Sequence, residues 1–305
     1  MTTAVVDIGT NSVRLLIAQK GGGWRDILRT VEVTRLGEGV DCNRIIKKEA
    51  MERTLATLAE YKDLMDRHGV QGSRIISTSA MRDAKNAAEF IELVKERLGF
   101  DIEVISGKEE GRLTFAGATG MDSLVSEDDV ALVVDVGGGS TEYIYGKSGQ
   151  VFGAMSIDVG SVRLTELFIK HDPPIEDELT EARGMIRRLT EPVFKEAADE
   201  NPSVLVAVAG TATQLSAVHY RVEPYDPERI HGSKITLAEL KGLIAKLASL
   251  KVDVRRELPG MRPERADVIV AGALILDETM SKLCFPEMVI SEKDILDGLL
   301  YSLDD

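Results

Sequence analysis

The chain has 305 residues, of which 44% are hydrophobic and 29% are charged, a length and composition typical of about two soluble globular domains. Its net charge of −14 argues against indiscriminate binding to nucleic acid or to anionic membranes. No stretch approaches the roughly 20 apolar residues of a membrane span, and the first strand leaves no room for a signal peptide, so we expect a cytoplasmic protein.

Apolar and β-branched runs predict strands, and amphipathic runs predict helices, in the first part of the chain. The expected strands span residues 4–9, 12–19, 26–36, 74–77 and 102–105, and the expected helices span residues 47–68, 84–98 and 109–118. The acidic segment Gly120–Asp129 shows no period and is the best candidate for a linker.

The same pattern begins again after this segment. The expected strands span residues 130–136, 140–146, 150–157 and 204–209, and helices are expected from Ser161 and at 181–198, 212–220, 237–249, 264–281 and 292–303. Three strands followed by a helix, twice over, predict a duplicated α/β architecture in two lobes, residues 1–125 and 126–305. We expect helix 292–303 to pack back on the first lobe.

Two segments that lie 128 positions apart, VVDIGTNS (5–12) and VVDVGGGS (133–140), are nearly alike. Each is an apolar strand that ends in an aspartate, Asp7 or Asp135, followed by a glycine turn and a hydroxyl side chain. Both turns lead into a second strand, whereas a dinucleotide fingerprint or a Walker loop needs a helix directly after its glycines. Two such hairpins facing each other could hold a phosphate and its metal between related lobes.

The hairpins supply carboxylates and phosphate donors. Burying an unpaired carboxylate costs several kcal/mol, so Asp7 and Asp135 indicate a function, the alternative being aspartates that cap their own turns. The turns also offer donors to an anion, both backbone amides without a neighbouring Cβ and polar side chains, from Gly137, Gly138, Gly139, Asn11, Ser12 and Ser140.

Further glutamates lie near these turns. Glu142 shares a strand face with Ser140, which indicates a metal site, a water-filled cleft or an exposed strand glutamate. Ser106 and Glu109 fit the S-x-x-E capping box, which uses Glu109 to hold the helix start. Glu110 points about 100° further around the helix and is free to act elsewhere, although any acid in a first turn also gains from the helix dipole.

Candidate phosphate-binding groups also occur outside the hairpins. Arg82 lies in a loop rich in small hydroxyl residues, which suits bidentate phosphate capture, although a lone loop arginine is usually a surface residue. Gly210 and Thr211 open a helix after an apolar strand, which makes either an anion site or an ordinary strand-to-helix turn.

The acidic charge is concentrated in the second half of the chain. Residues 1–125 carry 18 Lys+Arg and 19 Asp+Glu, whereas residues 126–305 carry 19 and 32. A polyanionic substrate is therefore expected to meet the first half, where basic side chains lie near the candidate motifs at Arg82, Lys85, Lys108 and Arg112.

Six motifs, taken in order, resemble one family. They are DIGTNS (7–12), STSAMRDA (77–84), ISGKEEGR (105–112), DVGGGSTE (135–142), AGTAT (209–213) and IHGSKIT (230–236). Together they resemble the exopolyphosphatase / guanosine pentaphosphate phosphohydrolase family, part of the superfamily of sugar kinases and actin, over essentially the whole chain. The resemblance implies two duplicated ribonuclease-H-like (actin-like ATPase) domains with the site in the interdomain cleft, and a homodimer.

The resemblance also implies residue roles. By motif match, Glu110 is the catalytic base, and Asp135 and Glu142 are the carboxylates of the metal and phosphate site. Phosphate binding falls to Asn11, Ser12, Arg82 and Gly137–Gly139.

We therefore expect an exopolyphosphatase that removes the terminal phosphoryl group from inorganic polyphosphate. Mg²⁺ or Mn²⁺, held near Asp135 and Glu142 with Asp7 acting through water, would neutralise the phosphate oxygens while Glu110 deprotonates the attacking water. Two alternatives stay open. One is hydrolysis of pppGpp, ADP or ATP in the same site, because Gly210-Thr211 matches the adenosine contacts of nucleotide-binding relatives. The other is a non-catalytic regulator that binds polyphosphate or nucleotide.

Overall fold

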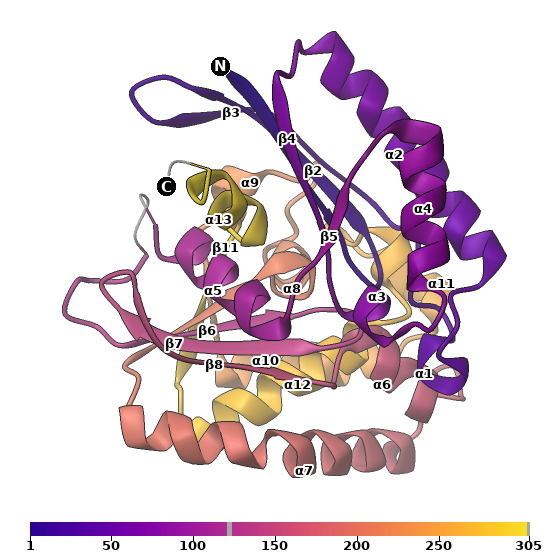
Figure 1. Ribbon diagram of the computed structural model, residues 1–305. Coiled ribbons are helices and arrows are strands. Elements are labelled where there is room, and N and C mark those ends of the chain that lie inside the picture. The colour runs from indigo at the N-terminus through magenta and orange to yellow at the C-terminus, as the bar shows by residue number, and fades with distance from the viewer. Residues whose placement is uncertain (121–123, 304–305) are drawn as a thin grey trace.

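The computed structural model describes residues 1–120 and 124–303, which form two lobes, each built on one β-sheet (Figure 1). The elements of the first lobe are β1 (Thr2–Ile8), β2 (Val13–Lys20), β3 (Trp24–Glu32), α1 (Val40–Asn43), α2 (Lys48–Arg67), β4 (Gly72–Ser77), α3 (Ser79–Asp83), α4 (Ala87–Leu98), β5 (Ile102–Val104) and α5 (Gly107–Ala118). Three residues of the expected linker, 121–123, lie outside the described residues.

The second part of the chain forms a larger sheet with helices on its outer side. Its elements are β6 (Ala131–Val136), β7 (Thr141–Lys147), β8 (Gln150–Ile157), α6 (Ser161–Phe168), α7 (Glu176–Glu200), β9 (Val204–Val208), α8 (Ala209–Tyr220), α9 (Pro227–Ile230), β10 (Lys234–Thr236), α10 (Leu237–Ala248), α11 (Val252–Arg256), the 3₁₀ helix η1 (Pro263–Arg265), α12 (Ile269–Leu283), β11 (Glu287–Ser291) and α13 (Ile295–Tyr301).

The two sheets repeat one topology. The strand order is β3-β2-β1-β4-β5 in the first and β10-β11-β9-β6-β7-β8 in the second. In both, the first three strands of the lobe pair antiparallel, and the first strand also pairs in parallel with a later one, β4 or β9. The predicted duplicated α/β fold is confirmed, with β10 as an added edge strand.

Alternation along the central strands points both aspartates toward the space between the lobes. In β1, Ala4 and Val6 pack with α2 and α4, whereas Val5 packs with α5 and α13. Asp7 shares the parity of Val5 and so faces the same side. In β6, Val133 packs with Phe115 of α5, and Asp135 shares its parity. The alternation of side chains along the strands thus directs the Asp7 and Asp135 carboxylates toward the same space between the lobes.

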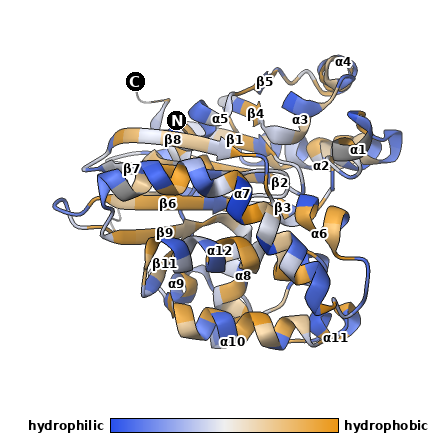
Figure 2. Ribbon diagram, turned by 90° about the horizontal axis from the view of Figure 1, so that it is seen from below, coloured by the Kyte–Doolittle hydropathy of each residue, from blue (hydrophilic) through white to orange (hydrophobic). Residues whose placement is uncertain are grey.

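The central strands are apolar along nearly their whole length because both of their faces are covered. All residues of β6 are buried, as are six of the seven residues of β1. Figure 2 shows β6 and β9 as largely hydrophobic, with hydrophilic residues on the outer helices. Across the described residues, no helix combines the length and the apolar character needed to cross a bilayer.

Several element boundaries differ from those expected. Residues 33–36 lie beyond the end of β3, and α7 begins at Glu176 rather than at residue 181. The early start of α7 has a physical cause, since the Glu178 carboxylate accepts a hydrogen bond from the backbone of Ile175 at the helix terminus. The expected helix 264–281 is a 3₁₀ turn followed by α12, and the short elements α9, β10, α11 and β11 were not expected.

The C-terminal helix α13 lies against β1 of the first lobe and crosses α5 closely (Figure 1). Glycines permit this crossing. A Cβ on Gly298 would lie 1.8 Å from the backbone oxygen of Leu113, and one on Gly117 would lie 1.8 Å from that of Asp294. Ion pairs reinforce the contact, because Asp294 and Asp297 of the C-terminal segment meet Arg14 and Arg29 of the first lobe.

Replacing Gly298 with alanine is expected to destabilise the protein by about 3 kcal/mol or more, since the clash is with backbone and one helix must move. The matched control is Gly184→Ala in α7, where a Cβ meets nothing within 4 Å and the helix should gain about 0.5–1 kcal/mol. Chemical denaturation of both variants measures the difference in their free energies of unfolding. Equal values would contradict the close approach of α13 to α5 at Gly298.

Candidate active site

The two glycine turns meet between the lobes. They have the same local structure, because the Gly9 amide donates to the Ser12 carbonyl (2.9 Å) and the Gly137 amide donates to the Ser140 carbonyl (3.0 Å). A Cβ on Gly138 would lie 3.2 Å from the Cβ of Thr10, so the second turn packs directly on the first. The turns form the walls of one pocket.

Four carboxylates line this pocket, namely Asp7, Asp135, Glu142 and Glu110. Each residue is between 1% and 8% exposed. Burial is the main cause that raises the pKa of all four, opposed at Asp7 and Glu110 by neighbouring arginines and reinforced at Glu142 by the other carboxylates. Burial raises the pKa of Asp135 to about 7. The pocket thus concentrates negative charge in a low dielectric.

Glu110 reaches the pocket from the first turn of α5. Ser106 caps this helix by accepting a hydrogen bond from the Glu109 amide (3.2 Å). The Glu109 carboxylate does not close the expected capping box but pairs with Arg112 on the surface (2.9 Å). One residue further on, the Glu110 carboxylate turns inward and accepts a hydrogen bond from Arg82 (2.7 Å). The 100° step between the neighbours separates a surface acid from a pocket acid.

Arg82 is fixed by two contacts. Its guanidinium donates to the Glu110 carboxylate and to the Ile105 carbonyl (3.1 Å). Arg82 is not among the residues that line the pocket, so it contacts the pocket through Glu110. Its positive charge opposes the effect of burial on the pKa of Glu110 and favours the ionised carboxylate.

Donors for an anion surround the carboxylates. The pocket is lined by Gly137–Gly139, Ser12, Ser140 and Asn11. Because the Gly137 amide is bonded to the Ser140 carbonyl, the amides of Gly138 and Gly139 are the ones this turn offers to an anion. Both side-chain polar atoms of Asn11 are buried without a hydrogen-bond partner, and a bound phosphate could accept a hydrogen bond from the amide nitrogen of this side chain. The N-terminus of α8, at Ala209 and Gly210, also faces the pocket and has no side-chain cap.

Thr211, expected to bind phosphate, does not line the pocket. Its buried hydroxyl donates to the Val136 carbonyl at the end of β6 (2.9 Å) and so ties α8 to that strand. Lys85, Lys108 and Arg112, the basic residues expected to meet a polyanion, do not line the pocket either. Every other candidate residue from the sequence is brought to the pocket or, for Arg82, to its edge.

Two pocket arginines were missed. Arg14 holds the Asp7 carboxylate with two nitrogens (2.9 and 2.6 Å) and holds Asp294 with a third (2.5 Å). A signal for it existed, because Arg14 follows Asp7 by seven residues as Glu142 follows Asp135. Both pairs are cross-strand partners in their hairpins. The second hairpin therefore places an acid where the first places a base.

Arg265 is the other missed cation. It lies in η1, and its guanidinium packs against Gly210 so closely that a Cβ there would be 2.1 Å from Nη2. Within residues 1–120 and 124–303 it has no carboxylate partner. Burial, together with nearby Arg262 and Arg14, lowers its pKa to about 10. An unpaired, half-buried cation beside the glycine turns is suited to an anionic ligand.

The negative charge of the pocket suits a divalent cation, but its side chains do not form a site that encloses a metal ion completely. Among the described residues, no three His, Cys, Asp or Glu side chains are grouped closely enough to hold a metal ion. The pocket nevertheless has four carboxylates and two arginines, and one oxygen of Asp7 is buried without a partner. Mg²⁺ typically keeps several waters and binds one or two carboxylates plus substrate phosphates, which suits this donor set.

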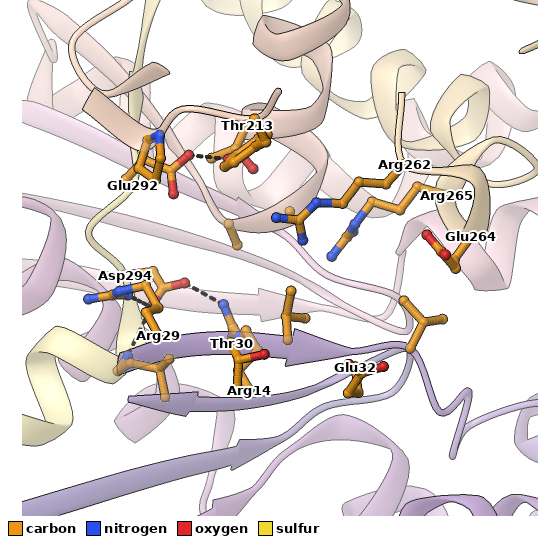
Figure 3. A pocket seen from close by; sticks show the side chains of 17 residues that line it. Arg14, Arg29, Thr30, Glu32, Thr213, Arg262, Glu264, Arg265, Glu292 and Asp294 are labelled. Carbon is orange, nitrogen blue, oxygen red and sulfur yellow. Dashed lines mark hydrogen bonds and ion pairs between the residues drawn. The ribbon is translucent and has the colours of Figure 1, made fainter. Parts of the chain in front are cut away.

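A second, larger cavity of about 540 Å³ adjoins this pocket and shares Arg14, Ala209, Gly210 and Arg265 with it. Figure 3 shows Arg262 and Arg265 pointing into this cavity from the second lobe, opposite the strands of the first. The Arg262 guanidinium stacks 4.6 Å from the centroid of the Tyr225 ring. The pocket between the glycine turns therefore continues into a larger space between the lobes.

Comparisons with known proteins agree over the whole chain. The sequence profile of the Ppx/GppA phosphatase family matches residues 16–305. The chain is 38% identical to Exopolyphosphatase 2 of Mycobacterium tuberculosis, with 98% of each protein covered. A Ppx/GppA member from Aquifex aeolicus is 34% identical with a TM-score of 0.81, covering 100% of this chain and 97% of that one. An exopolyphosphatase from Cytophaga hutchinsonii is 27% identical with a TM-score of 0.92, covering 99% and 97%.

Proposed function

Because this chain belongs to the Ppx/GppA phosphatase family, and is therefore a hydrolase of phosphoanhydride bonds, we propose that it removes terminal phosphate from inorganic polyphosphate. The observation that carries the assignment of the site is the buried Glu110 carboxylate, which lines the same pocket as two facing glycine turns. Hydrolysis of a phosphoanhydride needs a water-activating group and donors to the phosphoryl oxygens, and both are present here.

Glu110 acts as the general base. Its carboxylate is held by Arg82, which fixes its direction and favours its ionised form, so it can take a proton from water as the water attacks the terminal phosphorus. The same contact makes Arg82 a positioning residue for the base. The leaving group is the shortened chain, which keeps the bridging oxygen.

Charge on the transferring phosphoryl group is stabilised by the amides of Gly138 and Gly139, by Asn11 and by Arg265. Arg14 opposes the effect of burial on the pKa of Asp7 and holds this carboxylate at the pocket. Asp135 and Glu142 would hold Mg²⁺, with Asp7 contributing through water, and the cation would neutralise phosphate oxygens that otherwise face these acids. Ser156 donates to Glu142 (2.7 Å) and orients it for this role.

The direct test is release of phosphate from polyphosphates of defined length, with and without a chelator. Release that needs a divalent cation and stops on chelation is the expected result. Absence of release from every chain, with pppGpp, ADP and ATP also inert, would leave a non-catalytic binding protein instead. The buried, arginine-held Glu110 speaks against that alternative, because a binding module has no use for it.

Hydrolysis of pppGpp, ADP or ATP is the second candidate function. The specific observation in its favour is the adjoining cavity, which is lined by the Tyr225 ring and the Thr213 side chain. An aromatic face and a hydroxyl suit a nucleoside. Turnover of the nucleotides beside tripolyphosphate would separate the two substrates.

The stability of the metal-free protein should fall as pH rises through about 7. The folded state raises the pKa of Asp135 from 3.8 to about 7, so between these values the folded state binds a proton that the unfolded state releases. We therefore expect a higher Tm near pH 5.5 than near pH 8 without metal. Mg²⁺ should raise Tm more at the higher pH, since it binds the ionised carboxylates.

Thermal melts of wild type and Asp135→Asn, in chelator and in Mg²⁺, check this expectation. The variant should lose much of both the pH dependence and the Mg²⁺ response. A Tm that rises with pH in the chelated wild type would contradict it.

The proposal also includes a cytoplasmic location and a homodimer, the latter testable by light scattering after size-exclusion chromatography.

A further inference from the structure

The cavity beside the catalytic pocket has balanced charge. Four arginines and four acids line it, namely Arg14, Arg29, Arg262 and Arg265 with Glu32, Glu264, Glu292 and Asp294. A groove that guides a long polyanion is expected to carry a clear excess of positive charge. This cavity has no such excess.

Most of its arginines already have partners. Arg14 pairs with Asp7 and Asp294, and Arg29 pairs with Asp297 at 2.8 Å. Arg262 is stacked on an aromatic ring. Arg262 and Arg265 both lack a carboxylate partner in the described part of the chain, and of these two only Arg265 also lines the catalytic pocket. The unpaired positive charge nearest the reacting phosphate is therefore that of Arg265.

Three of the acids, Glu32, Glu264 and Glu292, line the cavity but not the catalytic pocket, and none of them forms an ion pair with a described residue. The Glu292 carboxylate accepts a hydrogen bond from the Tyr225 hydroxyl. Glu32, which ends β3 in the first lobe, and Glu264, in η1 of the second, are both exposed, and neither forms an ion pair with a described residue. Figure 3 shows both on the same side of the cavity, one from each lobe.

Resting on the proposed function, we infer that this cavity selects for short substrates. Each phosphate beyond those held in the catalytic pocket and by Arg265 would lie among Glu32, Glu264 and Glu292, and like charges repel. Tripolyphosphate and tetrapolyphosphate, or a phosphate chain that ends in an uncharged group, escape this repulsion. Long chains do not.

The test is a triple variant, Glu32→Gln, Glu264→Gln and Glu292→Gln, which keeps side-chain shape and removes three charges. The quantity measured is kcat/KM per chain end for long polyphosphate divided by that for tripolyphosphate. In the wild type this ratio should be well below one and should rise with ionic strength. The variant should raise it at least about tenfold, with less than about threefold change for tripolyphosphate.

The matched control is Glu181→Gln, Glu191→Gln and Glu200→Gln, three exposed positions on α7, on the outer side of the second sheet (Figure 1). It changes the net charge equally, and its ratio should equal that of the wild type. A wild-type ratio near one, or the same rise in both triple variants, would overturn the inference.

Failure of the proposed function gives a different result. If no chain of any length releases phosphate, affinities of the same chains for the Glu110→Gln protein, with and without the three cavity substitutions, still decide the inference. The inference is supported if the Glu110→Gln protein binds tripolyphosphate more tightly than long chains and the three cavity substitutions abolish this difference in affinity. Equal affinity for all lengths in the absence of the substitutions overturns it.

Discussion

Replacing Glu110 with glutamine is expected to lower kcat for phosphate release by about 10²–10⁴-fold, the range typical of a lost general base. Glutamine has nearly the same shape and still offers an oxygen to Arg82, so the 2.7 Å contact and the start of α5 should survive. The amide cannot accept the proton of the attacking water. The loss should therefore appear in kcat, while the Kd for substrate changes little.

Glu109→Gln is the control for this experiment. The two glutamates are neighbours in the first turn of one helix, but Glu109 pairs with Arg112 at the surface while Glu110 lies in the pocket. We expect Glu109→Gln to keep kcat within about twofold of wild type, as surface substitutions usually do. Circular dichroism establishes that both variants fold. Near-normal turnover by Glu110→Gln would remove it from the role of base.

The part of the site that could be predicted from sequence is the part that the chain builds locally. The two hairpins reveal themselves by their likeness, and the strand period then fixes that Asp7 and Asp135 face the same space. The capping serine at Ser106 and the helical step likewise separate Glu109 from Glu110. In each case, the residues that decide the geometry lie within one hairpin or one turn of helix.

The remaining features depend on contacts between distant parts of the chain. Arg14 pairs with Asp294, which lies 280 positions later in the chain, and the sequence around neither residue predicts this ion pair. Arg265 lies in a segment whose pattern predicts a helix, whereas a 3₁₀ turn there directs its guanidinium onto Gly210. The charge count of the two halves was misleading for the same reason, because the acidic half supplies the unpaired cation of the pocket.

Replacing Arg265 with glutamine is expected to lower kcat/KM by about 10²–10³-fold, the cost of losing one donor to the transition-state charge. Arg265 is shared by the catalytic pocket and the adjoining cavity, and it has no carboxylate partner among the described residues. Its removal should therefore cost little stability while weakening transition-state binding. Lysine at this position should restore activity in part, since it keeps the charge but not the planar fork.

Gly210→Ala tests the same contact without changing Arg265. The added Cβ would lie 2.1–2.4 Å from the guanidinium, the mobile end of a long side chain, so the guanidinium is displaced and the fold is not. Alanine also suits the first turn of α8 better than glycine does. We expect stability at or slightly above wild type together with a loss of kcat/KM of at least about tenfold.

The double variant gives the sharpest result. If Gly210→Ala acts by displacing Arg265, then adding it to Arg265→Gln should cost much less than it does alone, because the displaced group is already gone. Additive losses would mean that Gly210 acts on its own, through its backbone amide at the helix terminus, and that Arg265 contributes independently. Steady-state kinetics of the four proteins on tripolyphosphate distinguishes these two cases. If the residues are coupled, the loss of kcat/KM in the double variant should be close to that of Arg265→Gln alone. If they are independent, the fold-losses of the two single variants should multiply.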